Sequence, residues 1–337
     1  MSTPLLSIII PLHNGEATID RCLQSVAEAA AGVEAEVVVV DDGSTDRSLL
    51  RVQQFAAAHP DLTIRSVHTA HRGVAAARNE ALRVAAGQYV WPVDADDRVA
   101  RGSVRQLCST IAALQAERPD LIKLGAMVRG AQAECDVSHG RMLDAPWPLL
   151  DARNGCLDHT TYIYRCAFVV EQGLGYPEGM SLLEDSVWVA EVLMAASRVL
   201  YLPNARCYEL SPRRHSAWQR AERTRRVDDV VAFFAVLKRL CLSAPDACQC
   251  GAQRLYLRYR YLYARVLSVK GCAWSDVARL RKASRPPSSF FDQRTGLSER
   301  LLQNGVCHWI FTLACRVARP AVDRVRSWDS TEKEVRL

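Results

Sequence analysis

The sequence predicts an α/β protein with a mixed central sheet, followed by an α-helical C-terminal region. Over the first hundred residues, short β-branched runs alternate with amphipathic stretches, which is the pattern of parallel strands joined by crossover helices. Of the 337 residues, 49% are apolar, so the chain can bury a full core. Beyond residue 211 the pattern changes to arginine-rich helical stretches, which indicates a second, helical part.

Strands and helices alternate regularly in the first hundred residues. Apolar runs predict strands at residues 6–11, 36–40, 63–67 and 88–93. Helical periodicity predicts helices at residues 17–31, 46–59 and 73–86. Together these elements predict a Rossmann-like half, in which ligands bind beyond the carboxyl ends of the strands.

The middle of the chain is expected to extend the sheet with a less regular pattern. Helices are predicted at residues 101–116 and 184–196, and strands at 121–127, 162–164 and 198–202. Prolines interrupt the helical patterns beyond Ser211. We therefore expect a domain boundary near residue 215, with an α/β domain at residues 1–215 and a basic helical region at residues 216–337.

The two predicted parts carry opposite charge. Residues 1–200 hold 17 basic and 25 acidic side chains, whereas residues 201–337 hold 26 basic and 12 acidic ones. An acidic first part is compatible with binding a divalent cation, and a basic C-terminal part favours an anionic surface such as a membrane leaflet. Nucleic acid also fits a basic surface, but we do not expect it as a partner.

Cysteine usage and hydropathy bear on location. The twelve cysteines are scattered and match no common zinc spacing, so we expect reduced thiols. The N-terminus lacks a basic stretch and a cleavage site, and no apolar run reaches the ~20 residues that a transmembrane helix needs. A cytoplasmic protein is expected, and a peripheral contact with the inner face of the cytoplasmic membrane stays open.

Polar clusters follow three of the predicted strands. They are His13-Asn14-Gly15, Asp41-Asp42-Gly43-Ser44 and Asp94-Ala95-Asp96-Asp97. Because parallel strands end at the same edge of a sheet, these clusters should converge on one cleft. Adjacent carboxylates repel unless a cation offsets their charge, so Asp94, Asp96 and Asp97 predict a metal site. Asp46 is equally well explained as a helix cap.

Other nucleotide-binding and metal-binding motifs are missing from the sequence. A zinc site would need His or Cys ligands at tetrahedral spacing. A P-loop would end in Gly-Lys-Ser or Gly-Lys-Thr, and a dinucleotide site would have Gly-x-Gly-x-x-Gly where this chain has Pro11-Leu12-His13-Asn14-Gly15. A nucleoside diphosphate held through a magnesium or manganese ion is therefore the favoured ligand.

Five segments resemble successive motifs of the family 2 inverting glycosyltransferases, which have the GT-A fold. Four of them are SIIIPLHNGEATIDRCLQSV, EVVVVDDGSTDRS, HRGVAAARNEAL and GQYVWPVDADD, in the order and spacing of the family. The fifth, YPEGMSLLEDSVWVAEVLMAASRVLYLP, is similar to the acceptor-side segment of that family. The match covers roughly residues 5–215 and implies an enzyme of the bacterial surface-polysaccharide type.

The resemblance implies a donor site made from the strand-end clusters. The residues that would bind the donor nucleotide are Pro11, His13, Asn14, Asp41, Asp42, Arg78, Asn79 and Asp94. His13 stands where the family usually has a tyrosine, and a histidine ring can also stack on a base. Asp96 would be the principal ligand of Mn²⁺ or Mg²⁺, assisted by Asp94 and Asp97. For Arg78 and Asn79, a plain position on a helix surface is the alternative.

On the acceptor side, the resemblance implies Asp185 as the general base, with Glu184 as the alternative. In an in-line displacement at the anomeric carbon, such a base removes the proton of the attacking hydroxyl. Both acids can also simply begin a helix, where negative charge interacts well with the dipole. Arg213, Arg214 and His215 would approach the diphosphate, or else form a solvated basic face.

The implied function is a metal-dependent inverting glycosyl transfer. A hexosyl or N-acetylhexosaminyl group would move from a nucleoside-diphosphate donor, expected to be UDP-linked, to a growing glycan, in particular a lipid-linked surface polysaccharide. The alternatives are a nucleotidyltransferase of similar fold, whose Gly-rich N-terminal loop is missing here, and a non-catalytic relative that binds glycan or nucleotide. Basic and aromatic residues interleave at residues 255–263, which fits helix packing, an anionic membrane, an oligomer contact or nucleic acid.

Overall fold

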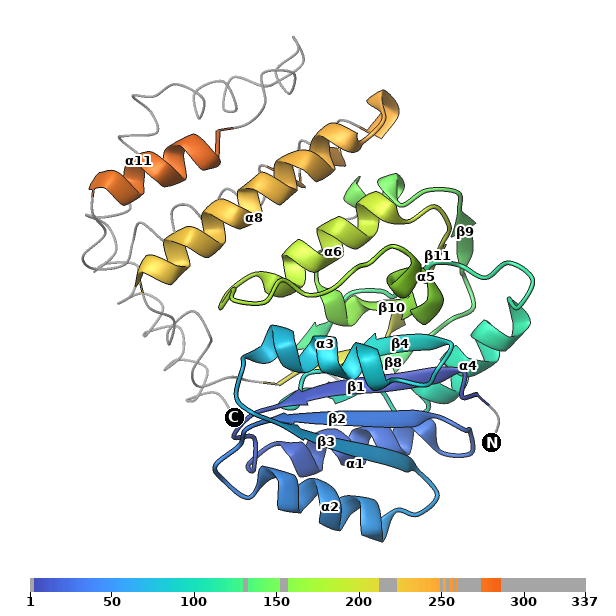
Figure 1. Cartoon of the computed structure of the whole chain (residues 1–337). Helices are drawn as coiled ribbons and strands as arrows, with labels where there is room; N and C mark the ends of the chain where they lie inside the picture. The colour runs from blue at the N-terminus through green and yellow to red at the C-terminus, as the bar shows by residue number, and fades with distance from the viewer. Residues whose placement is uncertain are drawn as a thin grey trace, which may run out of the picture.

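The centre of the molecule is an eight-stranded mixed sheet with helices on both faces (Figure 1). The computed structural model describes residues 3–129, 133–151, 157–211, 223–248, 251–252, 255–256, 259 and 274–285. The strand order is β3 (Thr63–Thr69), β2 (Glu36–Asp42), β1 (Leu6–Leu12), β4 (Tyr89–Pro92), β10 (Tyr162–Arg165), β6 (Leu121–Lys123), β11 (Val199–Tyr201) and β9 (Arg141–Leu143). The predicted α/β class with a mixed sheet is confirmed.

Strands β1 to β4 form the parallel half of the sheet. β1 pairs in parallel with β2 and β4, and β2 pairs in parallel with β3. All four follow the predicted apolar runs, with ends that differ by no more than two residues. Side chains alternate between the two faces of β1: Ile8 and Ile10 belong to one core cluster, and Ile9 belongs to the other. The strand is therefore buried on both faces. The polar residues of this segment of the chain come after the end of the strand.

Three crossover helices connect these parallel strands. They are α1 (Ile19–Ala30), α2 (Ser48–Ala58) and α3 (Val74–Val84), as the periodicity predicts but with shorter bounds. Figure 1 shows α1 and α2 on one side of the strands and α3 on the other. The face of α3 that packs on the sheet carries Ala75, Ala77 and Ala81, all buried. These small side chains let α3 approach the sheet closely. Arg78, which directly follows Ala77 on this helix, is also buried.

The second half of the sheet is mixed. β10 runs antiparallel to β4 and β6, β11 is parallel to β6, and β9 is antiparallel to β11. Helices α4 (Ser103–Ala113), α5 (Cys166–Glu171) and α6 (Glu184–Ala195) accompany it. β6 ends at Lys123, before the predicted end at residue 127. Leu124 N still donates to Thr161 O at 2.8 Å, but Gly125 N turns to Ala205 O at 3.0 Å and leaves the pairing with β10. A Cβ at Gly125 would lie 2.5 Å from Pro203 O, so this crossing needs glycine.

Two small sheets and three short 3₁₀ helices lie beside the main sheet. One sheet is β5 (Arg98–Val99), β13 (Tyr208–Leu210) and β7 (Val128–Arg129), and the other is β8 (Glu134–Cys135) with β12 (Ala205–Arg206). The 3₁₀ helices are Trp147–Asp151, His159–Thr161 and Asp246–Cys248. The β13 pairing brings residue 208 back beside β5, and so next to the acidic cluster that follows β4.

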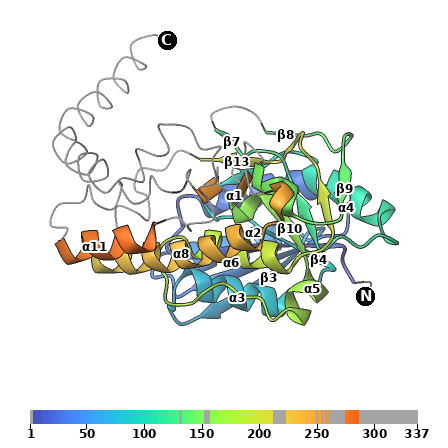
Figure 2. The same cartoon turned by 90° about the horizontal axis from the view of Figure 1, so that it is seen from above.

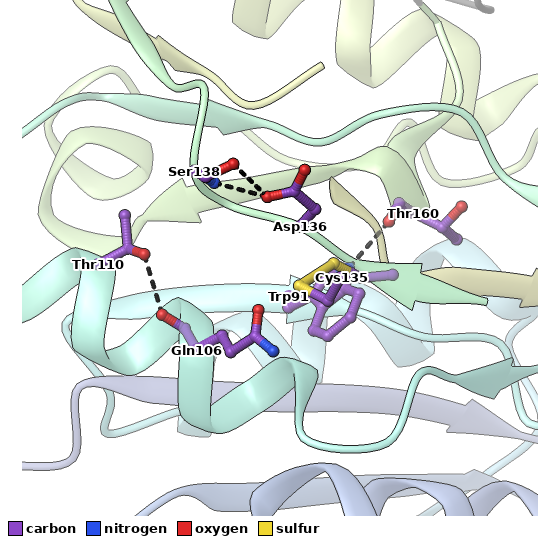
Figure 3. The surroundings of a disulfide bond; sticks show 8 residues. Trp91, Gln106, Thr110, Cys135, Asp136, Ser138 and Thr160 are labelled. Atoms are coloured by element: carbon purple, nitrogen blue, oxygen red, sulfur yellow. Dashed lines mark hydrogen bonds between the residues drawn. A yellow bond between two sulfur atoms is a disulfide. The ribbon is translucent and has the colours of Figure 1, made fainter. Parts of the chain in front are cut away.

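One pair of cysteines forms a disulfide, which corrects the expectation that all of them are reduced. Cys135 and Cys207 are bonded although they lie 72 residues apart in the sequence (Figure 3). The antiparallel pairing of β8 with β12 sets Cys135 opposite Ala205, and Cys207 follows two residues later, within reach of Cys135. Their spacing along the chain carries no sign of this, because the pairing is a long-range contact. Cys22, Cys108, Cys166 and Cys248 are free thiols in the described part of the chain.

Helix α8 (Arg223–Ser243) continues the core beyond the sheet. It packs on α6, and α11 (Trp274–Ala283) packs on α8 (Figure 2). Phe233, Phe234 and Leu237 on α8 are fully buried in the same core cluster as the α6 side chains. The predicted boundary at residue 215 lies outside the described residues. Among the helices that the structure describes, none is long and apolar enough to cross a membrane.

Only part of the basic and aromatic stretch at residues 255–263 is described. Leu255 and Tyr256 are buried, and Tyr259 packs against the core cluster. The Tyr256 ring lies 5.8 Å from that of Phe234, and its hydroxyl donates to Arg285 O at 3.3 Å. The rings of Tyr256 and Tyr259 therefore pack against the protein interior, which agrees with helix packing.

Candidate active site

Asp42, at the end of β2, organises the loop that leads into α3. Its buried carboxylate accepts hydrogen bonds from Arg72 N at 2.8 Å, from Gly73 N at 2.9 Å and from His71 Nδ1 at 2.8 Å. Gly73 has φ +97, a conformation that favours glycine. Asp42 therefore holds the backbone of Arg72 and Gly73 and the ring of His71 in place, at the edge of the sheet where β1 and β2 end.

A stacked pair of histidines lies beside Asp42. The rings of His13 and His71 are 4.1 Å apart and inclined by 20°, and His13 Nδ1 lies 2.7 Å from Asp42 O. Polar atoms of the two histidines and Asp42 fall within 4.8 Å of one another. In near-parallel rings, however, the nitrogen lone pairs run side by side and do not converge on one ion. The pair is better suited to offer a flat aromatic surface, and His71 was not singled out from the sequence although it begins the third motif.

The remaining predicted nucleotide residues on β1 and β2 line the same edge. Asp41 is 1% exposed, with Oδ2 at 2.7 Å from His68 Nδ1, and its Oδ1 has no hydrogen-bond partner among the described residues. Asn14 has φ +49 and accepts a hydrogen bond from Thr45 N at 2.8 Å, which ties the β1 loop to the β2 loop. Pro11 is buried within β1 and contributes backbone shape only.

The acidic cluster follows β4. Asp97 is fully buried, and its carboxylate accepts hydrogen bonds from Ser211 N at 2.8 Å and from the Tyr208 hydroxyl at 2.9 Å. That hydroxyl in turn accepts from Asp94 N at 3.1 Å. Asp97 thus holds the turn to the small sheet, whereas Asp94 and Asp96 are only partly buried. Arg21, which the sequence did not reveal, donates to Asp96 O at 3.2 Å from α1.

The cluster has the donor set of a hard divalent cation. One carboxylate oxygen from each of Asp94, Asp96 and Asp97 lies within 4.8 Å of the others. Magnesium and manganese prefer oxygen ligands, and three acids this close need a positive partner. The residues therefore fit Mn²⁺ or Mg²⁺, with Asp94 and Asp96 in more accessible positions than Asp97.

Arg78 connects this cluster to α6. It is 4% exposed, so it is not the surface charge that one alternative predicted. One guanidinium nitrogen donates to Asp94 Oδ1 at 3.0 Å and another to Glu184 Oε1 at 2.8 Å. Burial alone would lower the pKa of Arg78, but the two carboxylates outweigh it and raise the pKa above its usual value. A buried, permanently charged group therefore joins the two sides of the site.

Asp185 and Glu184 begin α6 but have different surroundings. The Glu184 side chain is 10% exposed and is bound to Arg78, whereas the Asp185 side chain is 33% exposed. Asp185 Oδ1 accepts a hydrogen bond from Ser186 N at 2.7 Å. Burial and the neighbouring Asp185 charge raise the pKa of Glu184, although Arg78 opposes this. Of the two acids, Asp185 is the more accessible.

His159 lies between the two sides of the site and was not anticipated from the sequence. It is 3% exposed, with Nδ1 at 3.6 Å from Asp185 Oδ2 and Nε2 at 3.8 Å from Asp94 Oδ1. Neither ring nitrogen has a hydrogen-bond partner among the described residues. The residue begins the 3₁₀ helix His159–Thr161, and its place depends on the pairing of β10 with β4.

Asn79, which was predicted to bind the donor nucleotide, contacts the segment that leads into α6. Asn79 pairs its amide with the backbone of Tyr176, donating to Tyr176 O at 2.9 Å and accepting from Tyr176 N at 2.7 Å. It therefore holds the segment in front of α6. Arg213, Arg214 and His215 lie outside the described residues.

Several known proteins are similar to this chain in sequence and in fold. The model of "Glycosyl transferase family 2" matches residues 7–133. The Mycobacterium tuberculosis protein MT1568, which is uncharacterized, is 30% identical over 234 residues, which make up 64% of this chain and 68% of that protein. The poly(ribitol-phosphate) beta-N-acetylglucosaminyltransferase TarS of Staphylococcus aureus is 28% identical over 61% of this chain. The aligned stretch spans 35% of TarS, and less than two thirds of several other curated relatives.

Solved structures support the same fold. The crystal structure of TarS residues 1–349 in complex with UDP-GlcNAc superimposes with a TM-score of 0.64 at 20% identity, covering 94% of this chain and 92% of that one. The mannosyltransferase PcManGT of Pyrobaculum calidifontis, in complex with GDP-Man and Mn²⁺, reaches 0.51 at 19% identity, covering 94% and 87%. Family model, sequence relatives and fold agree, and the chain belongs to glycosyl transferase family 2, with the GT-A fold.

Proposed function

We propose that this protein transfers a sugar from a nucleoside-diphosphate donor to an acceptor hydroxyl, with inversion and with help from a divalent cation. The observation that carries the proposal is the pair of acidic sites joined by Arg78. Asp94 belongs to a carboxylate cluster suited to a cation, and Glu184 stands next to the accessible Asp185. A donor diphosphate and an acceptor hydroxyl need these two kinds of group on opposite sides of the anomeric carbon.

The base and ribose of the donor would bind at the ends of β1 and β2. The stacked rings of His13 and His71 offer an aromatic surface to a nucleobase, and Asp41 and Asp42 offer carboxylates to its N–H groups. Asn14 and Pro11 would shape the same wall, and Asp94 would reach the ribose or the cation. UDP is the proposed carrier because the TarS structure of the same fold is a complex with UDP-GlcNAc.

Asp96 would be the main ligand of Mn²⁺ or Mg²⁺, together with Asp94. A bound cation supplies positive charge for the departing diphosphate. Asp97 would act mainly by holding the turn, because both of its oxygens already accept protein hydrogen bonds. The relative with the same fold that was solved with GDP-Man contains Mn²⁺, which supports the choice of metal.

Asp185 would remove the proton from the acceptor hydroxyl as that oxygen attacks the anomeric carbon. Glu184 is less suited to this step, because its side chain is buried and Oε1 already accepts a hydrogen bond from Arg78. The acceptor is proposed to be a growing surface polymer, in line with the polymer named for TarS, and lipid-linked at the inner face of the membrane. The transferred group would be a hexose or an N-acetylhexosamine.

A donor screen tests this proposal. The full chain would be incubated with a panel of UDP-, GDP- and dTDP-linked sugars, with Mn²⁺ or with EDTA, while binding and donor hydrolysis or transfer are recorded. We expect one UDP-sugar to bind and turn over, with a strong loss in EDTA. A chain that neither binds nor turns over any donor, with or without metal, would refute the proposal.

The same assay separates the alternatives. A nucleotidyltransferase would release pyrophosphate from a nucleoside triphosphate and a sugar phosphate. A non-catalytic relative would bind a donor without any turnover in the presence of acceptor glycans.

A further inference from the structure

The segment that leads into α6 has no strand or helix of its own. Residues 174–183 connect α5 to the helix that begins with Glu184 and Asp185. Buried backbone N–H groups outside regular structure need partners from elsewhere in the molecule. Near its start the segment is held by Asn79, through the paired bonds to Tyr176.

A buried carboxylate from α8 holds the other end of this segment. Asp229 Oδ2 accepts hydrogen bonds from Ser181 N and from Leu182 N, each at 3.0 Å. Asp229 is 6% exposed and lies on the side of α8 that packs against α6. Bonds from backbone N–H groups to an ionised acceptor are among the strong hydrogen bonds in proteins.

The next residue, Leu183, has a strained backbone. Its φ is +65 and its ψ is 13, which is the left-handed region that residues other than glycine seldom adopt. Leu183 O accepts a hydrogen bond from Val187 N at 2.9 Å, so this residue sets the start of α6. The two bonds to Asp229 fix the peptide units that end at Ser181 and at Leu182. They therefore help to hold the conformation from which Asp185 projects.

Burial is the main reason that the pKa of Asp229 lies above its usual value, and the Ser181 and Leu182 N–H groups oppose the shift. The neighbouring Asp228 has a different environment. Its side chain is 56% exposed and pairs with Arg279, which is also exposed. Two adjacent acids on one helix thus differ in burial and partners while carrying the same charge.

We propose that Asp229 is a positioning residue for the transfer reaction: from the C-terminal helical region it fixes the backbone in front of α6 and so aims Asp185 at the acceptor hydroxyl. The inference rests on the proposed role of Asp185. Since a misplacement of about 1 Å can cost about 100-fold in rate, loss of this anchor should slow transfer without weakening donor binding. The donor clusters lie on other elements, after β1, β2 and β4.

The test compares Asp229→Ala with Asp228→Ala, which removes the same charge from the neighbouring position. UDP affinity with Mn²⁺ would be measured by calorimetry, and transfer would be measured with the donor sugar that the screen selects. We expect Asp229→Ala to keep UDP affinity within about twofold and to lower kcat at least about tenfold, whereas Asp228→Ala leaves both unchanged. Asp229→Asn should restore most of kcat, because one amide oxygen can accept both hydrogen bonds.

Three results would overturn the inference. They are a kcat of Asp229→Ala equal to that of Asp228→Ala, a loss of UDP affinity as large as the loss of kcat, and an Asp229→Asn variant no better than Asp229→Ala. If Asp229→Ala does not fold, the same comparison of kcat and UDP affinity is made between Asp229→Glu and Asp228→Glu. Asp229→Glu keeps the charge but displaces the carboxylate oxygens from the two N–H groups. A wild-type chain without donor turnover would refute the proposed function instead, so the two failures are distinguishable.

Discussion

The donor side and the acceptor side of the candidate site are held together in different ways. On the donor side, Asp42 is the last residue of β2 and Asp94 comes two residues after β4, and their positions are set by the pairing of β1 with β2 and β4. On the acceptor side, Asp185 follows an irregular segment whose anchors are distant in sequence. Asn79 lies 97 residues from its partner Tyr176, and Asp229 lies 48 residues from Ser181.

The charged groups of the molecule differ in burial. Helices α1 and α2 on the donor side carry ion pairs at the surface, such as Arg51 with Asp20. Arg78, by contrast, is buried and joins Asp94 to Glu184 at the start of α6. Asp120, at the sheet edge opposite the site, is also buried and joins β10 to the residues before β11. Removal of one of these buried charges should therefore cost far more than removal of a charge from a surface pair of α1 and α2.

The largest effect is expected for Arg78→Met. The substitution keeps the side-chain stem but leaves Asp94 and Glu184 without their shared partner, so the free energy of unfolding should fall by about 3–5 kcal/mol. Urea denaturation measures the loss. Arg83→Met is the matched control on the same helix, because Arg83 is exposed and pairs only with the nearby Glu80 in the described structure. Equal free energies of unfolding for the two variants would contradict the difference between buried and surface charges.

A smaller effect is expected for Asp120→Ala. Asp120 accepts hydrogen bonds from Arg165 at 2.6 Å, from Ser197 N at 3.0 Å and from Arg198 N at 3.2 Å, and so joins β6, β10 and the approach to β11. Arg165 is partly exposed, which reduces the expected cost to about 2–3 kcal/mol at neutral pH, measured by urea denaturation. A loss below about 1 kcal/mol would contradict the account.

The same variant should change the acid stability. Burial by itself would raise the pKa of Asp120, but the Arg165, Ser197 and Arg198 donors outweigh it and hold the pKa below the usual 3.8. A carboxyl with a lowered pKa stabilises the folded state above its unfolded pKa, and this stabilisation is lost as the pH falls through its folded value. The free energy of unfolding of the wild type should therefore exceed that of Asp120→Ala by less and less as the pH falls below about 4.

The smallest effect is expected for Asp20→Ala on the donor side. Asp20 pairs with Arg51 at 3.2 Å, and the two side chains are 49% and 42% exposed. Exposed pairs of this kind contribute less than about 1 kcal/mol, so the melting temperature should hardly change. A loss comparable to that of Asp120→Ala would show that the donor side also depends on its charges.

The sequence predicted the parallel half and the three strand-end clusters because these features are local. The run Glu36 to Val40 is followed at once by Asp41 and Asp42, and both the strand and its polar end can be recognised within a few residues. Elements of the mixed half were found with less accurate ends. β6 stops soon after Lys123 because the chain turns toward residues 203 and 205, and no local pattern contains these contacts.

Several groups around the site could not be predicted, because their positions depend on distant partners. His159 stands beside Asp94 and Asp185 only after β10 has paired with β4. Asp229 looks like an ordinary polar residue of an amphipathic helix until α8 packs on α6. The Cys135–Cys207 disulfide has the same cause, since it requires the pairing of β8 with β12.

The central claim is that Asp96 serves the donor and Asp185 serves the acceptor. Its most direct test measures Mn²⁺-dependent UDP affinity and the transfer rate side by side for Asp96→Asn and Asp185→Asn. We predict that Asp96→Asn weakens UDP binding at least about tenfold, as expected from the loss of a principal metal ligand. Asp185→Asn should bind UDP like the wild type and transfer about 10²–10⁴-fold more slowly. Loss of UDP binding in both variants, or full transfer activity in Asp185→Asn, would contradict it.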